Sequence, residues 1–167
     1  MAKKPGGGTP ATVVLEQAGV PYVLRPYRHR PENASYGQEA VVALGLDPAQ
    51  VFKTLVAELT GPVTGPAELV VGVVPVSTTL DLKALAAALG SKRATMADPA
   101  AASRSTGYVL GGISPIGQRH RLRTVLDTSA DRFPTVLVSA GKRGLQVELA
   151  PADLVRVTAA LRAAIGA

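Results

Sequence analysis

Leu69-Val70-Val71-Gly72-Val73-Val74-Pro75-Val76 is an almost unbroken apolar run near the middle of the chain. Branched apolar residues at this density predict a strand that is covered on both faces and central to a sheet. The segment before it, Val51 to Leu59, is also rich in β-branched and bulky residues and predicts a second strand. Pro62, Gly65 and Pro66 form the turn between them. We therefore expect the sheet to grow outward from this pair.

The flanking sequence predicts further strands and helices. Strands are expected at residues 21–27, 108–110 and 124–127, in an extended basic piece at 92–94, and in a hairpin of 134–139 with 145–149. Helices are expected from Thr9-Pro10 to Gly19, at 36–44, from a Thr79 or Asp81 cap to Leu89, after Asp98-Pro99, and at 151–165. Strands and helices do not alternate regularly. The prediction is a single α+β domain, residues 9–167, with a curved, mostly antiparallel mixed sheet or barrel flanked by helices.

Composition excludes several kinds of site. The chain has 167 residues, no Cys and only 2 His, which excludes disulfides, thiolate metal sites and a cysteine nucleophile. We expect no metal and no cofactor. No apolar run approaches the roughly 18 to 20 residues of a membrane-spanning helix, so we expect a cytoplasmic protein without membrane contact. Residues 1–8, with three glycines, predict a flexible N-terminal tail.

The chain is basic, with a net charge of +6, and this charge favours a polyanionic partner. Aromatic residues make up only 4% and Trp is absent, which argues against a platform that stacks bases. The cations are either a phosphate-binding rim or a solvated charged surface. The basic residues that cluster along the sequence are the candidates for this rim, which would contact a nucleic-acid backbone: Lys92, Arg93, Arg119, Arg121, Arg123, Lys142 and Arg143.

The most unusual segment runs from Arg104 to Gln118 and holds four glycines, a proline and three small hydroxyl side chains. Gly111-Gly112 can adopt positive φ and present amide N–H groups to an anion or a developing oxyanion. The alternative is a tight turn between strands. The segment lacks the Gly-Lys-Ser/Thr of a nucleotide P-loop.

Two single residues are candidate pocket groups. Lys53 lies in an apolar strand, where it either points into a pocket or faces solvent. Tyr27 is either a core aromatic or a pocket donor. A Ser-His-Asp hydrolase can be written from Ser105 or Ser114, His29 or His120, and Asp127, but the sequence has no nucleophile-elbow pattern.

Four motifs occur in the order found in the YbaK family, and the chain resembles that family from about Thr9 to Leu154. They are Val51-Phe52-Lys53-Thr54-Leu55, Lys92 to Pro99, Arg104 to Gln118 and Ser139 to Leu145. Members of the family are free-standing relatives of the editing domain inserted in bacterial prolyl-tRNA synthetases. The resemblance implies a trans-editing aminoacyl-tRNA deacylase that removes cysteine from tRNA(Pro), and also from tRNA(Cys).

The resemblance also implies roles for individual residues. It assigns catalysis to Lys53, Gly111, Gly112 and Ile113. It implies substrate contacts from Tyr27, Arg104, Ser105, Thr106, Ser114 and Pro115. In the family the thiol of the substrate is thought to attack its own carbonyl, so the ester is cleaved either by cyclisation or by hydrolysis. Expected partners are the aminoacylated tRNA and, in a transient complex, prolyl-tRNA synthetase; DNA is not expected.

One position departs from the family pattern. Members often carry Asp before the final Val/Ile-Glu-Leu, where this chain has Gln146 and therefore no carboxylate at this position. The alternative functions are a non-catalytic tRNA-binding or synthetase-associated module, and an editing deacylase for another small amino acid such as alanine.

Overall fold

The computed structural model describes residues 8–30, 32, 35–60 and 67–167, so the predicted tail lies outside the described residues except for Gly8. The helices are α1 (Pro10–Ala18), α2 (Tyr36–Leu44), α3 (Leu82–Ala88), α4 (Pro99–Thr106) and α5 (Pro151–Thr158), with a 3-10 helix η1 (Thr128–Arg132). The strands are β1 (Val23–Pro26), β2 (Phe52–Thr60), β3 (Glu68–Pro75), β4 (Arg93–Met96), β5 (Arg123–Asp127), β6 (Val136–Lys142), β7 (Leu145–Leu149) and β8 (Leu161–Ala163).

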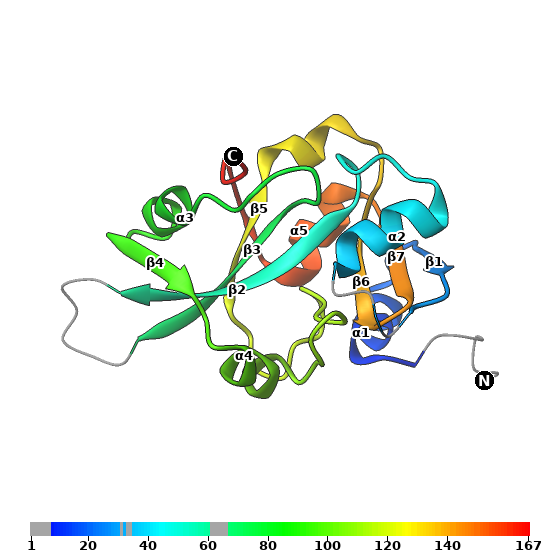
Figure 1. Ribbon diagram of the computed structural model, residues 1–167, viewed down its shortest axis with the longest axis horizontal. Helices are drawn as coiled ribbons and strands as arrows, with labels where there is room; N and C mark the ends of the chain where they lie inside the picture. The colour runs from blue at the N-terminus through cyan, green and yellow to red at the C-terminus, as the bar shows by residue number, and fades with distance from the viewer. Residues whose placement is uncertain (1–7, 31, 33–34, 61–66) are drawn as a thin grey trace.

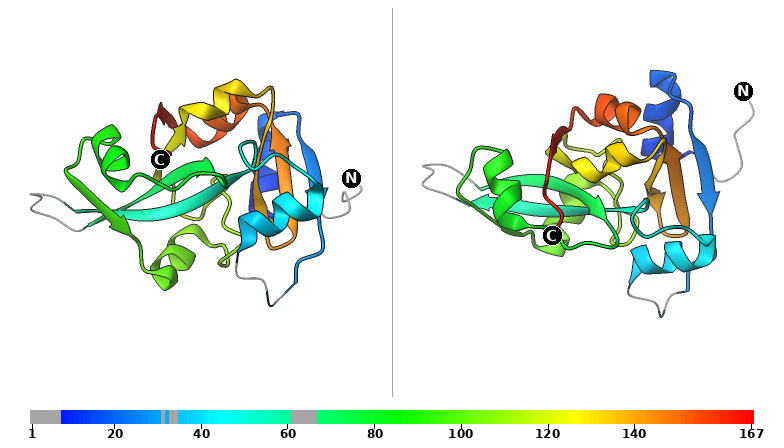
Figure 2. Two further views of the ribbon diagram at one scale, coloured as in Figure 1. Left: turned by 45° about the horizontal axis from the view of Figure 1, so that its top comes forward. Right: turned by 90° about the horizontal axis from the view of Figure 1, so that it is seen from above.

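The strands form two sheets (Figures 1 and 2). A five-stranded sheet has the order β4-β2-β3-β5-β8, with β2 antiparallel to β3 and β4, and β5 parallel to β3 and β8. An antiparallel three-stranded sheet has the order β1-β7-β6. The predicted α+β domain with mixed and antiparallel pairing is confirmed, and the sheets do not close into a barrel.

Strand β2 connects the two sheets, because one of its edges contacts β6 at the start of the strand and β4 at the end. Between these two contacts the edge is unpaired in the described residues. Val51, directly before β2, forms a parallel bridge with Leu137 of β6. At the other end, β4 pairs with β2 only from Ala57 to Thr60. Residues 52–55 therefore pair with β3 on one side and have a free edge on the other, as far as the described residues show. This free edge positions the candidate site.

Two apolar clusters hold the layers together. The larger packs the three-stranded sheet against one face of β2 and β3, with Leu15 of α1 and Leu154 of α5 among its buried members. The other lies under α3, where Leu85 meets Val74 and Ile165. Alternate residues of β3 belong to different clusters, so both faces of this strand are covered, as its unbroken apolar sequence predicts.

Helix starts follow the predicted capping residues. Thr9, Asp81 and Asp98 each accept a hydrogen bond from the backbone N–H three residues further on. The structure thus selects Asp81 over Thr79 as the cap of α3. Gly19 and Gly45 end α1 and α2 in the left-handed conformation, which a glycine adopts without strain.

Two predicted boundaries and one predicted strand are wrong. The predicted closing helix 151–165 stops at Thr158, because Ala159 turns left-handed (φ 56°) and the chain continues as β8 along β5. The pairing of β8 with β5 outweighs the helical propensity of this alanine-rich segment. Residues 108–110 form no strand and enter a turn instead. The hairpin strand β6 runs on to Lys142, with a register shift after Ser139, which leaves a shorter turn than predicted.

Asp127 fixes the end of the chain to the sheet. Its Oδ1 accepts hydrogen bonds from the backbone N–H groups of Ile165 and Gly166, each at 2.9 Å. Its Oδ2 accepts from the hydroxyl and the N–H of Ser129. Burial raises the pKa of Asp127, but these hydrogen bonds outweigh it and hold the pKa below its usual value.

Asp127→Asn is expected to lower the free energy of unfolding by about 2 kcal/mol at pH 7, because an amide cannot accept all four bonds. The folded-state pKa lies below the unfolded value, so the carboxylate stabilises the fold above about pH 4 and this contribution disappears as the pH falls through the folded pKa. Urea unfolding at pH 7 and at pH 3 measures both effects. An equal difference between wild type and variant at the two pH values would contradict the assignment.

None of the helices in the described part of the chain is long and apolar enough to cross a membrane.

Candidate active site

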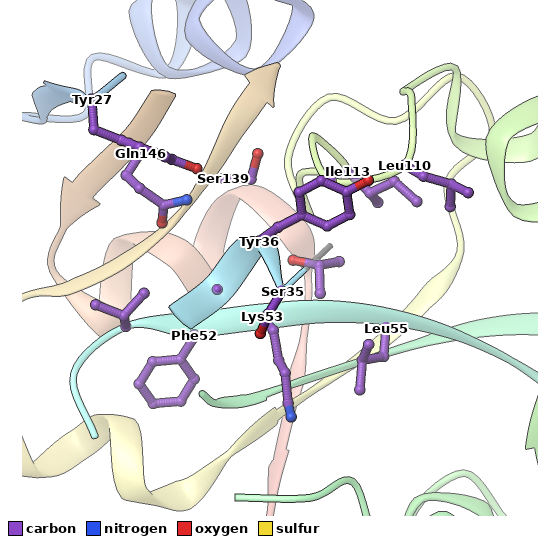
Figure 3. A pocket seen from close by; sticks show the side chains of 14 residues that line it. Tyr27, Ser35, Tyr36, Phe52, Lys53, Leu55, Leu110, Ile113, Ser139 and Gln146 are labelled. Carbon is purple, nitrogen blue, oxygen red and sulfur yellow. The ribbon is translucent and has the colours of Figure 1, made fainter. Parts of the chain in front are cut away.

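A pocket of about 400 Å³ opens at the free edge of β2 (Figure 3). Four segments far apart in the sequence form its walls: the start of β2, the first turn of α2, the loop after α4, and the three-stranded sheet. Its lining residues are Tyr27, Ser35, Tyr36, Gly37, Val51, Phe52, Lys53, Thr54, Leu55, Leu110, Gly111, Ile113, Ser139 and Gln146. The pocket is thus mostly apolar with a few polar groups, as small-molecule sites usually are.

Three polar side chains from the three-stranded sheet gather on one side of the pocket. Tyr27 follows β1, Ser139 belongs to β6 and Gln146 belongs to β7, and Figure 3 shows them next to one another. Burial raises the pKa of Tyr27, while hydrogen bonds from the Gly144 backbone and the Gln146 side chain act in the opposite direction. Gln146 is only 7% exposed, and its Oε1 has no hydrogen-bond partner among the described residues. A buried acceptor of this kind is available to a ligand.

Thr54 presents polar groups from the free edge of β2. Its Oγ1 is buried and has no hydrogen-bond partner among the described residues. The carbonyl of Val56 points out of this edge and accepts from Ala97 N–H at 3.1 Å. Because backbone groups alternate along an antiparallel strand, the N–H and C=O of Thr54 point out of the same edge. The edge therefore presents a backbone donor, a backbone acceptor and a hydroxyl.

The glycine loop forms another wall through a tight turn. Gly112 N–H donates to Val109 O at 2.9 Å, and Gly111 occupies the positive-φ position of this turn (φ 82°). A Cβ on Gly111 would lie 2.6 Å from the Tyr36 ring, and one on Gly112 would lie 2.8 Å from Lys142 Cα. Both glycines are therefore required by close packing. The N–H of Gly112, which we expected to face the substrate, is used within the turn.

Tyr36, which packs against Gly111 of the glycine loop, is held between two side chains. The Arg143 guanidinium lies 5.4 Å from the ring centroid and its Nε donates to Leu110 O at 2.7 Å, which ties the β6–β7 turn to the glycine loop. On another side, the His29 ring lies 5.8 Å away. Glu39 in turn holds His29 by a contact of 2.6 Å between its Oε1 and Nδ1. The hydrogen bond from His29 is the main reason that the pKa of Glu39 is lowered.

Lys53 lines the pocket together with Gly111 and Ile113. In Figure 3 its side chain extends away from Tyr36 and Ile113, so its Nζ does not lie beside the loop in this structure. Burial lowers the pKa of Lys53. The described residues provide it with no ion pair. A partly desolvated ammonium without a protein counter-charge is suited to an anionic ligand.

Several residues that the resemblance assigns to the substrate lie outside the pocket. Ser114 is fully buried and its Oγ accepts from Ile116 N–H. Thr106 Oγ1 donates to Ala102 O within α4, and Ser105 O accepts from His120 N–H. Residues in these positions support the loop rather than line the cavity. Gly112, Pro115 and Arg104 also lie outside the pocket lining, and Arg104 is exposed in the last turn of α4.

The predicted basic rim is dispersed over the molecule. Arg123 is paired with Glu68, and Arg121 reaches Val157 O on the far side of the glycine loop. Lys92 and Arg93 lie at the end of β2 remote from the pocket, since Arg93 pairs with Thr60 (Figure 1). Arg119 covers Gly107. Only Arg143 and its neighbour Lys142 adjoin the pocket walls among these seven residues.

The Ser-His-Asp alternative does not assemble. Asp127 binds the end of the chain, His29 is held by Glu39, and His120 Nδ1 lies 3.1 Å from Ser105 O. The two histidines therefore serve different parts of the structure, and neither meets Asp127.

Sequence reasoning did not single out Tyr36, Ser139 or Thr54 as site residues. Thr54 and Ser139 stand inside the quoted motifs. Strand alternation places Thr54 on the face opposite Lys53, so the choice of Lys53 gave no signal for Thr54. Tyr36 gave no signal, because its position depends on how α2 packs against the loop.

Comparison with known proteins agrees with this fold and gives the family of the chain. The profile described as "Aminoacyl-tRNA editing domain" matches residues 31–157. A protein of Enterococcus faecalis, EbsC, named as a proposed Cys-tRNA(Pro)/Cys-tRNA(Cys) deacylase, is 38% identical over 93% of this chain and 92% of its own length. An Escherichia coli protein, the multifunctional Ser/Thr-tRNA deacylase ProXp-y, is 32% identical over 65% of this chain and 64% of its own.

Solved structures show the same fold. The hypothetical protein APE2540 superposes with a TM-score of 0.81 at 20% identity, covering 95% of this chain and 99% of its own. A proposed trans-editing enzyme for prolyl-tRNA synthetase superposes with a TM-score of 0.76 at 24% identity, covering 95% of both chains. The chain belongs to the aminoacyl-tRNA editing domain family, within its YbaK branch. Its activity is that of an aminoacyl-tRNA deacylase, with a charged tRNA as substrate.

Proposed function

We propose that this deacylase removes cysteine from tRNA(Pro), using the thiol of the substrate as the nucleophile. The observation that carries the proposal is the chemistry of the pocket wall: among the described residues, no Asp, Glu, His or Cys lines it. The acidic and imidazole groups behind Tyr36 are bound to each other. A reaction that needs no protein base or nucleophile fits such a pocket.

In the proposed step, the cysteine sulfur attacks the ester carbonyl. A C–S bond forms, the C–O bond to the ribose breaks, and the ribose oxygen takes the thiol proton. The thiolactone product then reacts with water to give free cysteine. An aminoacyl ester is already activated, so the protein has mainly to position it and stabilise the charge on its carbonyl oxygen.

We assign the positioning to groups that have no other partner among the residues that the structure describes. Lys53 supplies a positive charge for the phosphate of the terminal adenosine, and Thr54 offers its edge N–H and C=O. The N–H of Gly111 or Ile113 remains for the carbonyl oxygen, because Gly112 N–H is used in the turn. Gln146 Oε1, an acceptor without a charge, faces the α-ammonium of the substrate in place of the carboxylate common in the family.

The E. coli relative favours a second candidate, removal of a hydroxyl amino acid. A serine or threonine hydroxyl inside the pocket has two buried groups to bond, Thr54 Oγ1 and Gln146 Oε1. This candidate requires an activated water, for which the described residues of the pocket wall offer only Tyr27, Tyr36 and Lys53 as titratable groups. Cysteine therefore remains the preferred substrate.

Purified protein incubated with Cys-tRNA(Pro) tests the proposal, with release of labelled cysteine followed under single-turnover conditions. We expect first-order release well above the spontaneous rate. Tight binding of the charged tRNA without release would instead establish a non-catalytic binding module. We further propose that prolyl-tRNA synthetase delivers the substrate, since a pocket of about 400 Å³ has room only for the end of the tRNA.

A further inference from the structure

A second groove lies next to the pocket, on the other side of Tyr27. It has a volume of about 540 Å³ and is lined by Pro26, Tyr27, Arg28, Arg30, Gln38, Glu39, Val42 and Ala43. Tyr27 lines both cavities, so a ligand that fills the pocket and continues past this ring enters the groove directly. The groove forms between the end of β1 and the exposed side of α2.

The charge of the groove is positive. Arg28 and Arg30 are exposed, and the described residues give neither guanidinium an ion pair. Glu39 is the one acidic residue among the lining residues, but its side chain is only 6% exposed. Both of its oxygens are occupied, Oε1 by His29 Nδ1 and Oε2 by Arg30 N–H at 2.8 Å. The bond to Arg30 N–H also fixes the backbone from which the second arginine projects.

We propose that this groove binds the phosphodiester backbone of the single-stranded RNA end, one nucleotide before the esterified adenosine. This inference rests on the proposed function. An aminoacyl ester in the pocket leaves the RNA chain to continue outward, and a chain that passes Tyr27 brings its next phosphate into the groove. Guanidinium groups bind phosphate oxygens in pairs of parallel hydrogen bonds, and two arginines in one open groove match a chain of phosphates.

The chemistry of the groove favours a backbone contact over base recognition. Arginine and a glutamine amide line it, and the partly buried Tyr27 ring at its inner end is the one aromatic side chain among its lining residues. Phosphate contacts position a strand without reading its sequence. In the predicted rim, Arg123 is paired with Glu68, and Lys92 and Arg93 lie at the remote end of β2. Arg143, which adjoins the pocket, is bound to Leu110 O.

The test compares Arg28→Ala/Arg30→Ala with Lys83→Ala/Arg156→Ala. The control also removes two positive charges, but from α3 and α5, away from the groove. With Cys-tRNA(Pro), the arginine variant is expected to lose at least about 10-fold in kcat/KM at low salt. The slope of log kcat/KM against log salt concentration is expected to become shallower by about 1.4, since two phosphate contacts on a single strand are lost. The control stays within about twofold of wild type. With 2′(3′)-O-cysteinyl-adenosine, which has the ester but no phosphate, all three proteins react alike.

Binding of a fluorescent CCA trinucleotide gives a second readout that does not depend on catalysis. The arginine variant is expected to bind at least about 10-fold more weakly than the control. Equal binding by the two variants overturns the inference, as does an equal loss on cysteinyl-adenosine and on charged tRNA. If wild type releases cysteine from neither substrate, the proposed function fails, and the trinucleotide still decides the role of the groove.

Discussion

Lys53→Ala is expected to lower kcat/KM for Cys-tRNA(Pro) by about 100-fold while leaving the melting temperature nearly unchanged. The side chain lines the pocket, is partly exposed and has no ion pair among the described residues. Its truncation therefore removes a charge that binds the substrate without opening a core cavity. Deacylation kinetics and thermal unfolding of the same preparation measure the two effects.

Lys83→Ala is the matched control, because it removes one exposed charge from α3. Lys53→Arg keeps the charge and is expected to recover part of the activity. Parallel loss of folding and activity in Lys53→Ala would show that this lysine has a structural role. Full activity would remove it from the site.

The pH dependence follows from the same residue. Burial lowers the pKa of Lys53, so its ammonium loses its proton at a lower pH than an exposed lysine does. The thiol of the substrate, with a pKa of about 8.5, becomes more reactive as the pH rises. The rate on Cys-tRNA(Pro) should therefore rise and then fall, and Lys53→Arg should extend the rising part to higher pH.

Cysteine is expected to leave tRNA(Pro) at least about 1000-fold faster than alanine or serine carried on the same tRNA. Pocket size alone separates amino acids that differ by a small group by only about 10-fold to 200-fold. Serine is nearly the size of cysteine, but its hydroxyl is almost fully protonated at neutral pH, whereas a few per cent of the thiol is ionised. Single-turnover rates for the three esters thus report on the nucleophile as well as on fit.

Comparable rates for serine and cysteine would contradict the thiol mechanism and favour the hydroxyl amino acid candidate. In that case Gln146→Leu distinguishes the hydroxyl amino acid candidate from the thiol mechanism, because it removes the buried Oε1 and keeps a side chain of similar size. If a substrate hydroxyl bonds this oxygen, Gln146→Leu would lower the deacylation rate of Ser-tRNA(Pro) more than that of Ala-tRNA(Pro).

The sequence predicts most of this fold because its elements are bounded by local signals. Capping residues and terminal glycines mark α1 to α4 within a residue or two, and the apolar run of β3 predicts a strand covered on both faces. The exceptions are long-range. The β8 segment is helical by composition and becomes a strand only because β5 and Asp127 are there to bind it.

The site was predictable in part for the same reason. Lys53, Gly111 and Ile113 stand out as a lysine in an apolar strand and a glycine-rich loop, and all three line one pocket. Tyr36 was not predictable, because it enters the site through the packing of α2 on Gly111 and Arg143. The dispersal of the basic residues was likewise beyond the sequence: neighbours along the chain, such as Arg121 and Arg123, face different partners.

The short β4 has a consequence for aggregation. An unpaired strand edge is a template on which another chain can add a strand, and such edges are a common start of misassembly. Here the free part of β2 spans residues 52–55, between the bridge at Val51 and the pairing that begins at Ala57. The first turn of α2 and the glycine loop line the pocket beside this edge, so a strand that added here would have to displace them. The walls that shape the substrate cavity therefore also keep two copies of the protein from joining their sheets.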